Sequence, residues 1–378
     1  MSLTMLGCLH DRRPAASEPG GATPHETALR LINWLLSDEV QLPIGAQAGG
    51  VLGWFDGAST RFVYPESTGY YLTILSFLHA RGWPVEGIPR RARRAADWLD
   101  RQGGRLSPPA TRVYLSDPPT KDWRNSFSFS FDLAMIWRGI AMTRQFLGAA
   151  SADRVQAAVE RRLFPLCSPD GGLLASVPIQ PGPAAESWSV HPGPFQLKSA
   201  AALLCSGGNP PPELRRNAQA TFERFREWTP NDCQPEFLHP CLYYVEGALL
   251  AGAAQNDPSL LRRAALALER LAAGALGPCG EPLLTLRSDA MAQILRSGCL
   301  LEAGGYLQRD LWNVALPRIA TALCRYCGPD GRMHFQRDAA GRPRHVNVWS
   351  GLFAAQALLW YGDWSRRALA IESAAWLV

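Results

Sequence analysis

The sequence lacks the features that would assign it to several common protein classes. No stretch approaches the ~18–20 uninterrupted apolar residues of a membrane span, and the first 21 residues lack the basic and apolar regions of a secretory signal. Lys and Arg form no extended tract, and the net charge of +5 is small for 378 residues, which disfavours a nucleic-acid-binding surface. We therefore expect a cytoplasmic protein with no membrane span and no nucleic-acid partner.

Cysteine and lysine are also sparse. The nine cysteines are odd in number and widely separated, unlike those of a disulfide-stapled scaffold. Cys324 and Cys327 form a lone CxxC without a second pair at metal-ligand spacing, so we expect no metal site and no cofactor. The only lysines are Lys121 and Lys198. Coding bias is one explanation, and a role for Lys198 as a titratable amine is the other.

One short motif recurs along the chain. It is clearest over residues 64–70 (YPESTGY), where an acidic residue opens an apolar helical segment and a glycine follows one turn later. Comparable small residues follow at roughly 50- to 70-residue intervals, at positions 69, 139, 200, 247, 298 and 351. We interpret this recurrence as six degenerate repeats.

Each repeat combines an amphipathic helix with a more uniformly apolar one. Residues 25–37 show the apolar spacing of an amphipathic helix, whereas residues 66–80 are mostly apolar on every side. A helix that is apolar all round has to be covered all round, which places the apolar helices in an inner ring and the amphipathic helices outside. The sequence therefore predicts an all-α fold, an (α/α)6 toroid of six helical hairpins.

We expect this toroid to be a single domain over residues 24–378, preceded by a disordered or draped tail over residues 1–23. A last helix is predicted over residues 364–377. Strands are expected only as short pieces inside the loops.

In such a ring the long loops and the N-termini of the inner helices gather at one end. Six ionisable side chains would surround that opening: Glu66, Asp132, His191, His239, Asp289 and His345. Aromatic side chains lie near them in the sequence: Trp54, Tyr64, Tyr70, Trp123, Trp188 and Trp349. Aromatic faces stack on sugar rings, and carboxylates and imidazoles bind sugar hydroxyls, so the pattern indicates a carbohydrate ligand.

Each of these side chains also has a purely structural interpretation. An Asp or Glu in the first turn of a helix can act as a cap that favours the macrodipole. A histidine there gains nothing as a cap, because the helix N-terminus disfavours the imidazolium form. His239 and His345 are therefore either core residues with satisfied hydrogen bonds or neutral imidazoles suited to general-base chemistry.

The segment over residues 64–70 and the inner-helix repeats resemble the six-hairpin glycosidase-like α/α toroid proteins, and among them poorly characterised proteins of bacterial polysaccharide loci. The resemblance spans about residues 25–375. For the glycoside hydrolases of this fold it implies a carboxylic acid pair across the funnel, drawn from Glu66, Asp132 and Asp289. For the N-acylglucosamine 2-epimerase-like proteins it implies histidines on the fourth and sixth inner helices, near His239 and His345.

The chain departs from some of these relatives. The fourth inner helix of the epimerase-like proteins reads His-x-x-Glu, whereas here Tyr243 begins the frame that ends in Glu246, and His239 lies a turn earlier. The Asp-rich motif of the toroid terpene cyclases is absent, as is the Cys/His zinc set of the lanthionine cyclases.

The sequence therefore predicts a carbohydrate-active enzyme that acts on an oligosaccharide or a polysaccharide building block. Hydrolysis by paired carboxylates is the first hypothesis, epimerisation or isomerisation by a histidine pair the second, and a non-catalytic glycan- or protein-binding toroid the third. The catalytic candidates are Glu66, Asp132, Asp289, His239 and His345. The substrate-binding candidates are Trp54, Tyr64, Tyr70, Trp123, Arg138, Trp188, His191, Tyr243, Glu246 and Trp349.

Overall fold

The computed structural model describes residues 22–55, 61–83, 87–103, 110–116, 122–182, 185, 187–230, 237–277, 280–283, 286–338 and 340–378. Residues 1–21 of the expected tail lie outside this set. The inner helices are α2 (Pro65–Ala80), α4 (Ser130–Leu147), α6 (Gln196–Cys205), α8 (Leu238–Gln255), α10 (Ser288–Ala303) and α12 (Val348–Ser365). The outer helices are α1 (Pro24–Leu35), α3 (Ile88–Gly103), α5 (Ala149–Leu163), α7 (Pro212–Phe225), α9 (Pro258–Ala273) and α11 (Arg309–Cys324).

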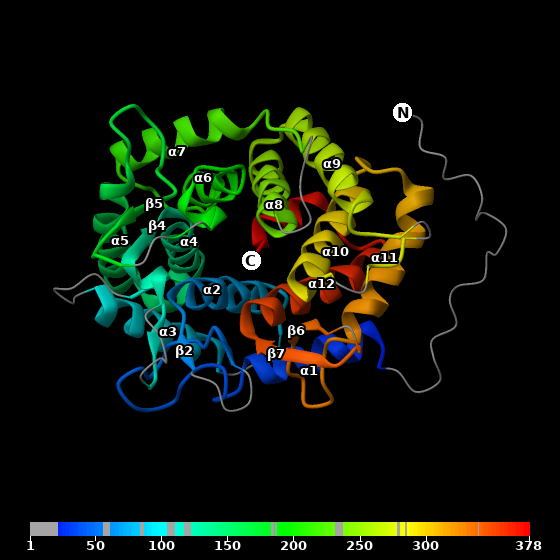
Figure 1. Ribbon diagram of the computed structural model, residues 1–378, viewed down its shortest axis with the longest axis horizontal. Coiled ribbons are helices and arrows are strands. Elements are labelled where there is room, and N and C mark those ends of the chain that lie inside the picture. The colour runs from blue at the N-terminus through cyan, green and yellow to red at the C-terminus, as the bar shows by residue number, and fades with distance from the viewer. Residues whose placement is uncertain are drawn as a thin grey trace.

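The inner helices form a closed ring (Figure 1). Each packs on the next from α2 to α12, and α12 packs on α2. The outer helices cover this ring, and α1 lies against α12 so that the first and last hairpins are joined. The predicted (α/α)6 toroid is confirmed. Because the first and last hairpins cover each other, we propose that residues 24–378 form one cooperative domain.

Glycines permit the closest contacts between inner helices. A Cβ on Gly69 of α2 would lie 2.8 Å from backbone atoms of Ile136 in α4, and one on Gly139 would overlap the carbonyl oxygen of Gly69. A Cβ on Gly247 of α8 would lie 2.5 Å from the backbone nitrogen of Lys198 in α6. These repeat positions therefore need glycine because two helix backbones touch there.

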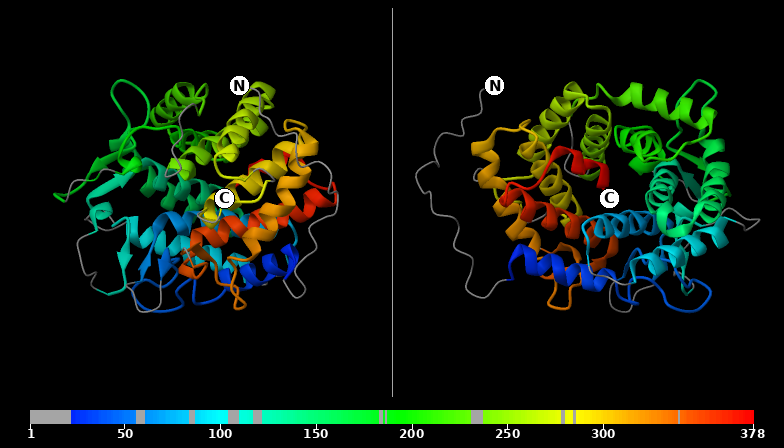
Figure 2. Two further views of the ribbon diagram at one scale, coloured as in Figure 1. Left: turned by 45° about the vertical axis from the view of Figure 1, so that its right-hand side comes forward. Right: turned by 180° about the vertical axis from the view of Figure 1, so that it is seen from behind.

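The chain after α12 does not form the helix predicted over residues 364–377. Helix α12 ends at Ser365, Arg367 adopts a positive φ of 58°, and residues Ile371–Trp376 form the short 3-10 helix η5. Side chains of the inner ring bind its carbonyl oxygens: Arg138 donates to Ala375 O at 2.7 Å, and Gln356 donates to Trp376 O at 2.7 Å. Seen from behind, this red segment lies across the centre of the ring (Figure 2, right). Tertiary hydrogen bonds thus replace those of a regular α-helix.

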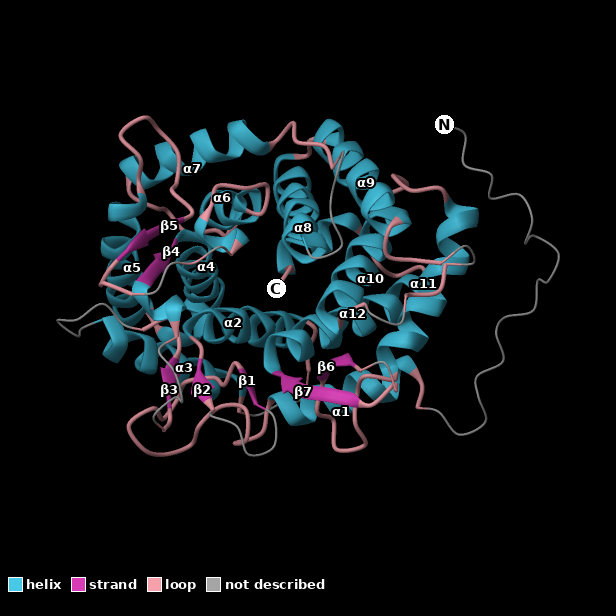
Figure 3. Cartoon of the chain, viewed as in Figure 1, coloured by secondary structure: helices cyan, strands magenta, loops and turns pink. Residues whose placement is uncertain are grey.

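Short strands tie together the loops that precede the inner helices (Figure 3). Strands β1 (Trp54–Phe55), β7 (Pro343–Asn347) and β6 (His334–Arg337) form one antiparallel sheet in the order β1-β7-β6, with Trp54 opposite Asn347. Strand β2 (Phe62–Val63) pairs with β3 (Val113–Tyr114), and β4 (Phe127–Phe129) pairs with β5 (Ser176–Pro178). The remaining short helices are η1 (Trp123–Ser126), η2 (Phe164–Leu166) and η3 (Trp188–Val190). No helix within the described ranges is both long and apolar enough to cross a membrane.

The contact between α2 and α4 generates a stability prediction. Gly139→Ala should lower the free energy of unfolding by about 2–3 kcal/mol, because the new methyl group overlaps backbone rather than a movable side chain. Urea denaturation of the two proteins measures this difference. Gly274→Ala is the matched control, because its nearest neighbour is Leu271 O at 3.7 Å, an ordinary contact. An equal effect of both substitutions would contradict the close approach of α2 and α4.

Candidate functional site

A cavity of about 300 Å³ opens at the end of the ring where the inner helices begin. Its lining comes from the first turns of α2, α4, α8 and α12 and from the loops between hairpins. The lining residues are Trp54, Tyr64, Glu66, Arg112, Arg124, Phe129, Phe131, Asp132, Ser187, Trp188, Ser189, His239, Tyr243, Arg287, Phe335 and Trp349. Carboxyl groups and aromatic rings therefore meet at the end of the ring where the repeat pattern placed them, and arginines lie there with them.

Glu66 lies in the first turn of α2 and is only 7% exposed. Burial raises the pKa of its carboxyl group, because the charged form loses its hydration. Hydrogen bonds from the hydroxyl groups of Tyr64 and Tyr70 oppose that rise, as do the positive charges of Lys198 and Arg112. The surroundings of Glu66 thus partly compensate a buried negative charge.

Asp132 lies in the first turn of α4, in the same cavity. Its pKa is raised well above the usual range, first by burial and then by the negative charge of Glu66. Positive charges on Arg124, Arg162 and Arg112 oppose this rise without cancelling it. Because two nearby carboxyl groups resist carrying two negative charges, Asp132 keeps its proton to a higher pH than Glu66. Of the two carboxyl groups, Asp132 is therefore the better proton donor and Glu66 the one that ionises first.

Aromatic side chains and a buried ion cluster form the floor beneath these carboxyl groups. The hydroxyl oxygens of Tyr70 and Tyr243 lie within hydrogen-bond distance of each other, 3.2 Å apart. Beneath them the Lys198 ammonium lies 4.7 Å from the centre of the Tyr243 ring and donates to Glu246 at 2.7 Å. Glu246 also accepts a 2.7 Å hydrogen bond from Arg296 Nε. Burial alone would raise the pKa of Glu246, but Arg296 and Lys198 outweigh it and lower that pKa, so Glu246 is a paired structural anion.

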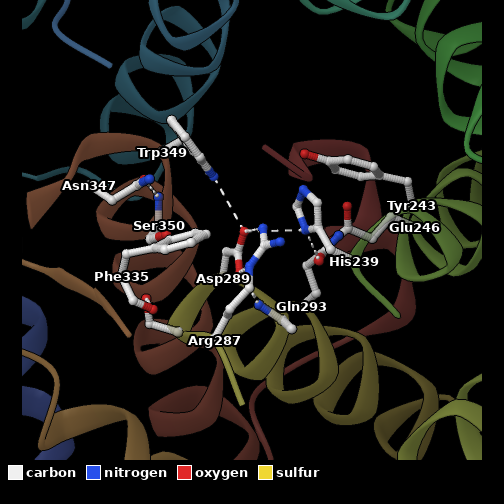
Figure 4. Close-up of polar contacts among 12 residues, drawn as sticks. His239, Tyr243, Glu246, Arg287, Asp289, Gln293, Phe335, Asn347, Trp349 and Ser350 are labelled. Atoms are coloured by element: carbon white, nitrogen blue, oxygen red, sulfur yellow. Dashed lines mark hydrogen bonds and ion pairs between the residues drawn. The ribbon is translucent and has the colours of Figure 1, made fainter. Parts of the chain in front are cut away.

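A second wall of the cavity is built around His239 (Figure 4). Its Nδ1 atom lies 2.8 Å from Gln293 Oε1 and 3.4 Å from Asp289 Oδ2. Both partners are acceptors, so Nδ1 carries the proton and Nε2 keeps its lone pair. Burial lowers the pKa of His239 to about 4. The imidazole is therefore neutral near pH 7 and could accept a proton from a ligand.

Asp289 is fully buried behind this wall and does not line the cavity. Burial opposes its ionisation, but the positive charge and hydrogen bonds of Arg287 outweigh burial and hold the pKa of Asp289 at about 2. Trp349 Nε1 also donates to it at 3.4 Å. Asp289 is thus a permanent anion that orients Arg287, His239 and Trp349, and it is unsuited to donating a proton.

The structure places eight of the predicted site residues around the cavity: Trp54, Tyr64, Glu66, Asp132, Trp188, His239, Tyr243 and Trp349. Tyr70 lies just beneath it, hydrogen-bonded to Tyr243. Arg138 and Glu246 lie deeper in the ring, because each stands eight residues into its helix, which is roughly 12 Å along the axis. There Arg138 binds the C-terminal segment rather than the cavity.

Three other predicted residues lie outside the lining. His345 is on strand β7, where its ring stacks on Phe335 with centroids 4.9 Å apart. His191 is exposed and borders a neighbouring hollow with Trp188. Trp123 supports the guanidinium of Arg124, which lies 4.4 Å from its ring centre. His239 and His345 therefore do not both face the cavity.

Eight lining residues were not among the predicted site residues, and the charged ones are three arginines: Arg112, Arg124 and Arg287. All three lie outside the helical repeat: Arg112 and Arg287 are in loops, and Arg124 is in the short 3-10 helix η1. Arginines are otherwise scattered along the chain. The sequence offered one signal for two of these arginines, their closeness to predicted site residues. Arg124 directly follows Trp123, and Arg287 lies two positions before Asp289. Within the described part of the chain, no group of His, Cys, Asp and Glu is arranged to hold a metal ion.

No protein-family model and no curated protein sequence matches the chain. Several solved structures match its fold. An unsaturated glucuronyl hydrolase specific for heparin aligns over 91% of this chain and 96% of its own, with a TM-score of 0.60 and 12% identity. A D-mannose isomerase aligns over 92% and 99%, with a TM-score of 0.65 and 11% identity. The cellobiose 2-epimerase of Spirochaeta thermophila aligns over 94% and 99%, with a TM-score of 0.61 and 13% identity. The chain thus has the six-hairpin toroid fold of these proteins, which confirms the resemblance at the level of the fold.

The neutral state of His239 generates a pH prediction. The pKa of histidine in the unfolded chain is about 6.5, and in the fold it is about 4. Because the folded pKa is the lower one, the corresponding stability is fully present above pH 6.5 and is lost as the pH falls toward 4. This change amounts to about 3 kcal/mol.

Urea denaturation at about pH 7 and about pH 4.5 measures the loss that this linkage predicts. Wild type should lose more stability on acidification than His239→Gln, which has no imidazole to protonate. His191→Gln is the control and should behave as wild type, because His191 is exposed. Equal pH dependence in wild type and His239→Gln would show that the imidazole is not held neutral.

Proposed function

We propose that this protein is a glycoside hydrolase that acts on an oligosaccharide or a polysaccharide building block. The observation that carries the proposal is the unequal carboxyl pair: Asp132 retains a proton that Glu66 gives up at lower pH, and both line one cavity. Hydrolysis of a glycosidic bond uses one protonated and one ionised carboxyl group. The aromatic lining supports the proposal, because Trp54, Trp188 and Trp349 offer flat faces to a sugar ring.

In this mechanism Asp132 donates its proton to the glycosidic oxygen as the bond from that oxygen to the anomeric carbon breaks. Glu66 acts on the anomeric carbon as the ionised carboxylate, either by activating a water molecule or by stabilising the developing positive charge. The hydroxyl groups of Tyr64 and Tyr70 hold Glu66 in its charged form. Water supplies the hydroxyl group of the new hemiacetal, and its remaining proton restores the acid.

Substitution of the two carboxyl groups tests the proposal. Glu66→Gln and Asp132→Asn should each lower kcat by about 10²- to 10⁴-fold, measured as release of reducing sugar from a panel of oligosaccharides and aryl glycosides. Near-ultraviolet circular dichroism should show that the fold is kept, since Gln and Asn preserve side-chain volume. Glu269→Gln on α9 is the matched control: burial raises the pKa of Glu269 too, but it lies away from the cavity. Full activity in Glu66→Gln or Asp132→Asn would refute the assignment.

Epimerisation is a second candidate, favoured by the neutral imidazole of His239 in the same cavity. A base of this kind could remove a proton from a sugar carbon.

 The matches reported above are one hydrolase, one isomerase and one epimerase, and they do not decide between the reactions.

Incubation with candidate sugars in deuterated water separates the two candidates. An epimerase places deuterium on the carbon that it inverts, because the abstracted proton exchanges with solvent, and His239→Gln should abolish that exchange. A hydrolase places no deuterium on carbon. Deuterium incorporation without cleavage of any glycoside would overturn the hydrolase proposal, and binding with neither reaction would leave a non-catalytic glycan-binding toroid.

A further inference from the structure

Two of the cavity's arginines share a single carboxylate. Arg112 Nη1 lies 3.0 Å from Asp122 Oδ2, and Arg124 Nη1 lies 3.9 Å from Asp122 Oδ1. Asp122 is occupied further, since it accepts hydrogen bonds from the Tyr114 hydroxyl at 2.8 Å and from the backbone nitrogen of Arg124 at 3.1 Å. One negative charge therefore faces two positive charges on this wall.

Arg112 is held rigidly but is not fully satisfied. Its guanidinium lies 4.3 Å from the centre of the Trp54 ring and 4.7 Å from that of Phe62. The residue is 7% exposed, and its buried Nε has no hydrogen-bond partner among the described residues. A buried donor without a partner is costly, so this guanidinium retains capacity to bind a group that enters the cavity.

Arg124 carries the more accessible charge of the two. A third of its side chain is exposed, at 33%, and its contact with Asp122 is too long for a hydrogen bond. Burial and then the positive charge of the neighbouring Arg112 lower the pKa of Arg124. Within the described residues, no ion pair joins either arginine to Glu66 or Asp132.

The third lining arginine, Arg287, differs from these two because it has a carboxylate of its own. Arg287 is bound to Asp289 through both Nε, at 3.0 Å, and Nη2, so its charge is matched by its own carboxylate. Among the described arginines that line the cavity, Arg112 and Arg124 are therefore the two that share one carboxylate within ion-pair distance, and Glu66 and Asp132 attract them only from farther away.

We propose that the Arg112–Arg124 wall binds an anionic group of the saccharide, a carboxylate or a sulfate ester, so that the substrate class is an acidic sugar. A planar guanidinium binds such oxyanions through paired hydrogen bonds. The inference rests on the proposed function only in assuming that the same cavity binds the sugar. It also fixes the orientation: the acidic group lies toward β3 while the anomeric carbon lies at Glu66 and Asp132.

Binding of monosaccharides tests the proposal without any need for turnover. The probes are glucuronate, glucose 6-sulfate and glucose, measured by isothermal titration calorimetry at low ionic strength. At least one acidic sugar should bind wild type about tenfold or more tightly than glucose. The acidic sugar that binds more tightly identifies the group as carboxylate or sulfate. Equal binding of all three sugars would overturn the proposal.

Variants assign the preference to this wall. Arg124→Gln should remove the tenfold preference while leaving the affinity for glucose unchanged, whereas arginines that merely balance the carboxyl pair would affect all three sugars alike. Arg154→Gln is the control, because Arg154 is an exposed residue of α5 paired with Asp100. Asp122→Asn keeps an N-cap for η1 and should strengthen acidic binding, which separates a charge effect from local unfolding. A preference that survives in Arg124→Gln would contradict the assignment.

The outcome is independent of the proposed reaction. Selective binding of acidic sugars without hydrolysis of any acidic glycoside would support the anion-binding wall and refute the hydrolase. Hydrolysis of neutral glycosides without a preference for acidic sugars would support the hydrolase and refute the anion-binding wall.

Discussion

The structure depends on one constraint: six helices that are apolar on nearly every side must be covered on every side. The outer helices cover their outward faces, and the ring itself covers their flanks. Their inward faces meet along an axis that has to be filled. At one end the C-terminal segment fills it, held by Arg138, Lys198 and Gln356. At the other end, where the helices begin, the axis stays open as the cavity.

The same packing places the two carboxyl groups beside each other. Gly69 and Gly139 allow α2 and α4 to touch through their backbones, and this contact brings the first turns of the two helices together. Glu66 and Asp132 occupy those turns. Burial raises the pKa of both groups, and two buried carboxyl groups cannot both ionise readily, so the close helix packing adds to the difference in their pKa values. Fold and chemistry therefore share one cause.

The sequence predicted the parts of this arrangement that follow helical periodicity. The repeats located the inner helices and the end at which Glu66 and Asp132 meet. Periodicity could not locate the C-terminal segment, because the bonds that Arg138 and Gln356 make to it depend on ring closure. Nor could it identify Arg124, which lines the cavity from the short 3-10 helix η1 between α3 and α4. The depth of Arg138 could have been predicted by counting residues from the start of its helix.

The central claim is that Asp132 holds its proton to a higher pH than Glu66, first because Asp132 is buried and then because Glu66 is negatively charged in the same cavity. Infrared difference spectroscopy of the protonated carboxyl stretch, followed against pH in wild type, Glu66→Gln and Asp132→Asn, tests this most directly. The account predicts that the last of the two protons to leave in wild type belongs to Asp132. It also predicts that in Glu66→Gln this proton leaves at a lower pH. An Asp132 titration that is unchanged in Glu66→Gln would contradict the account.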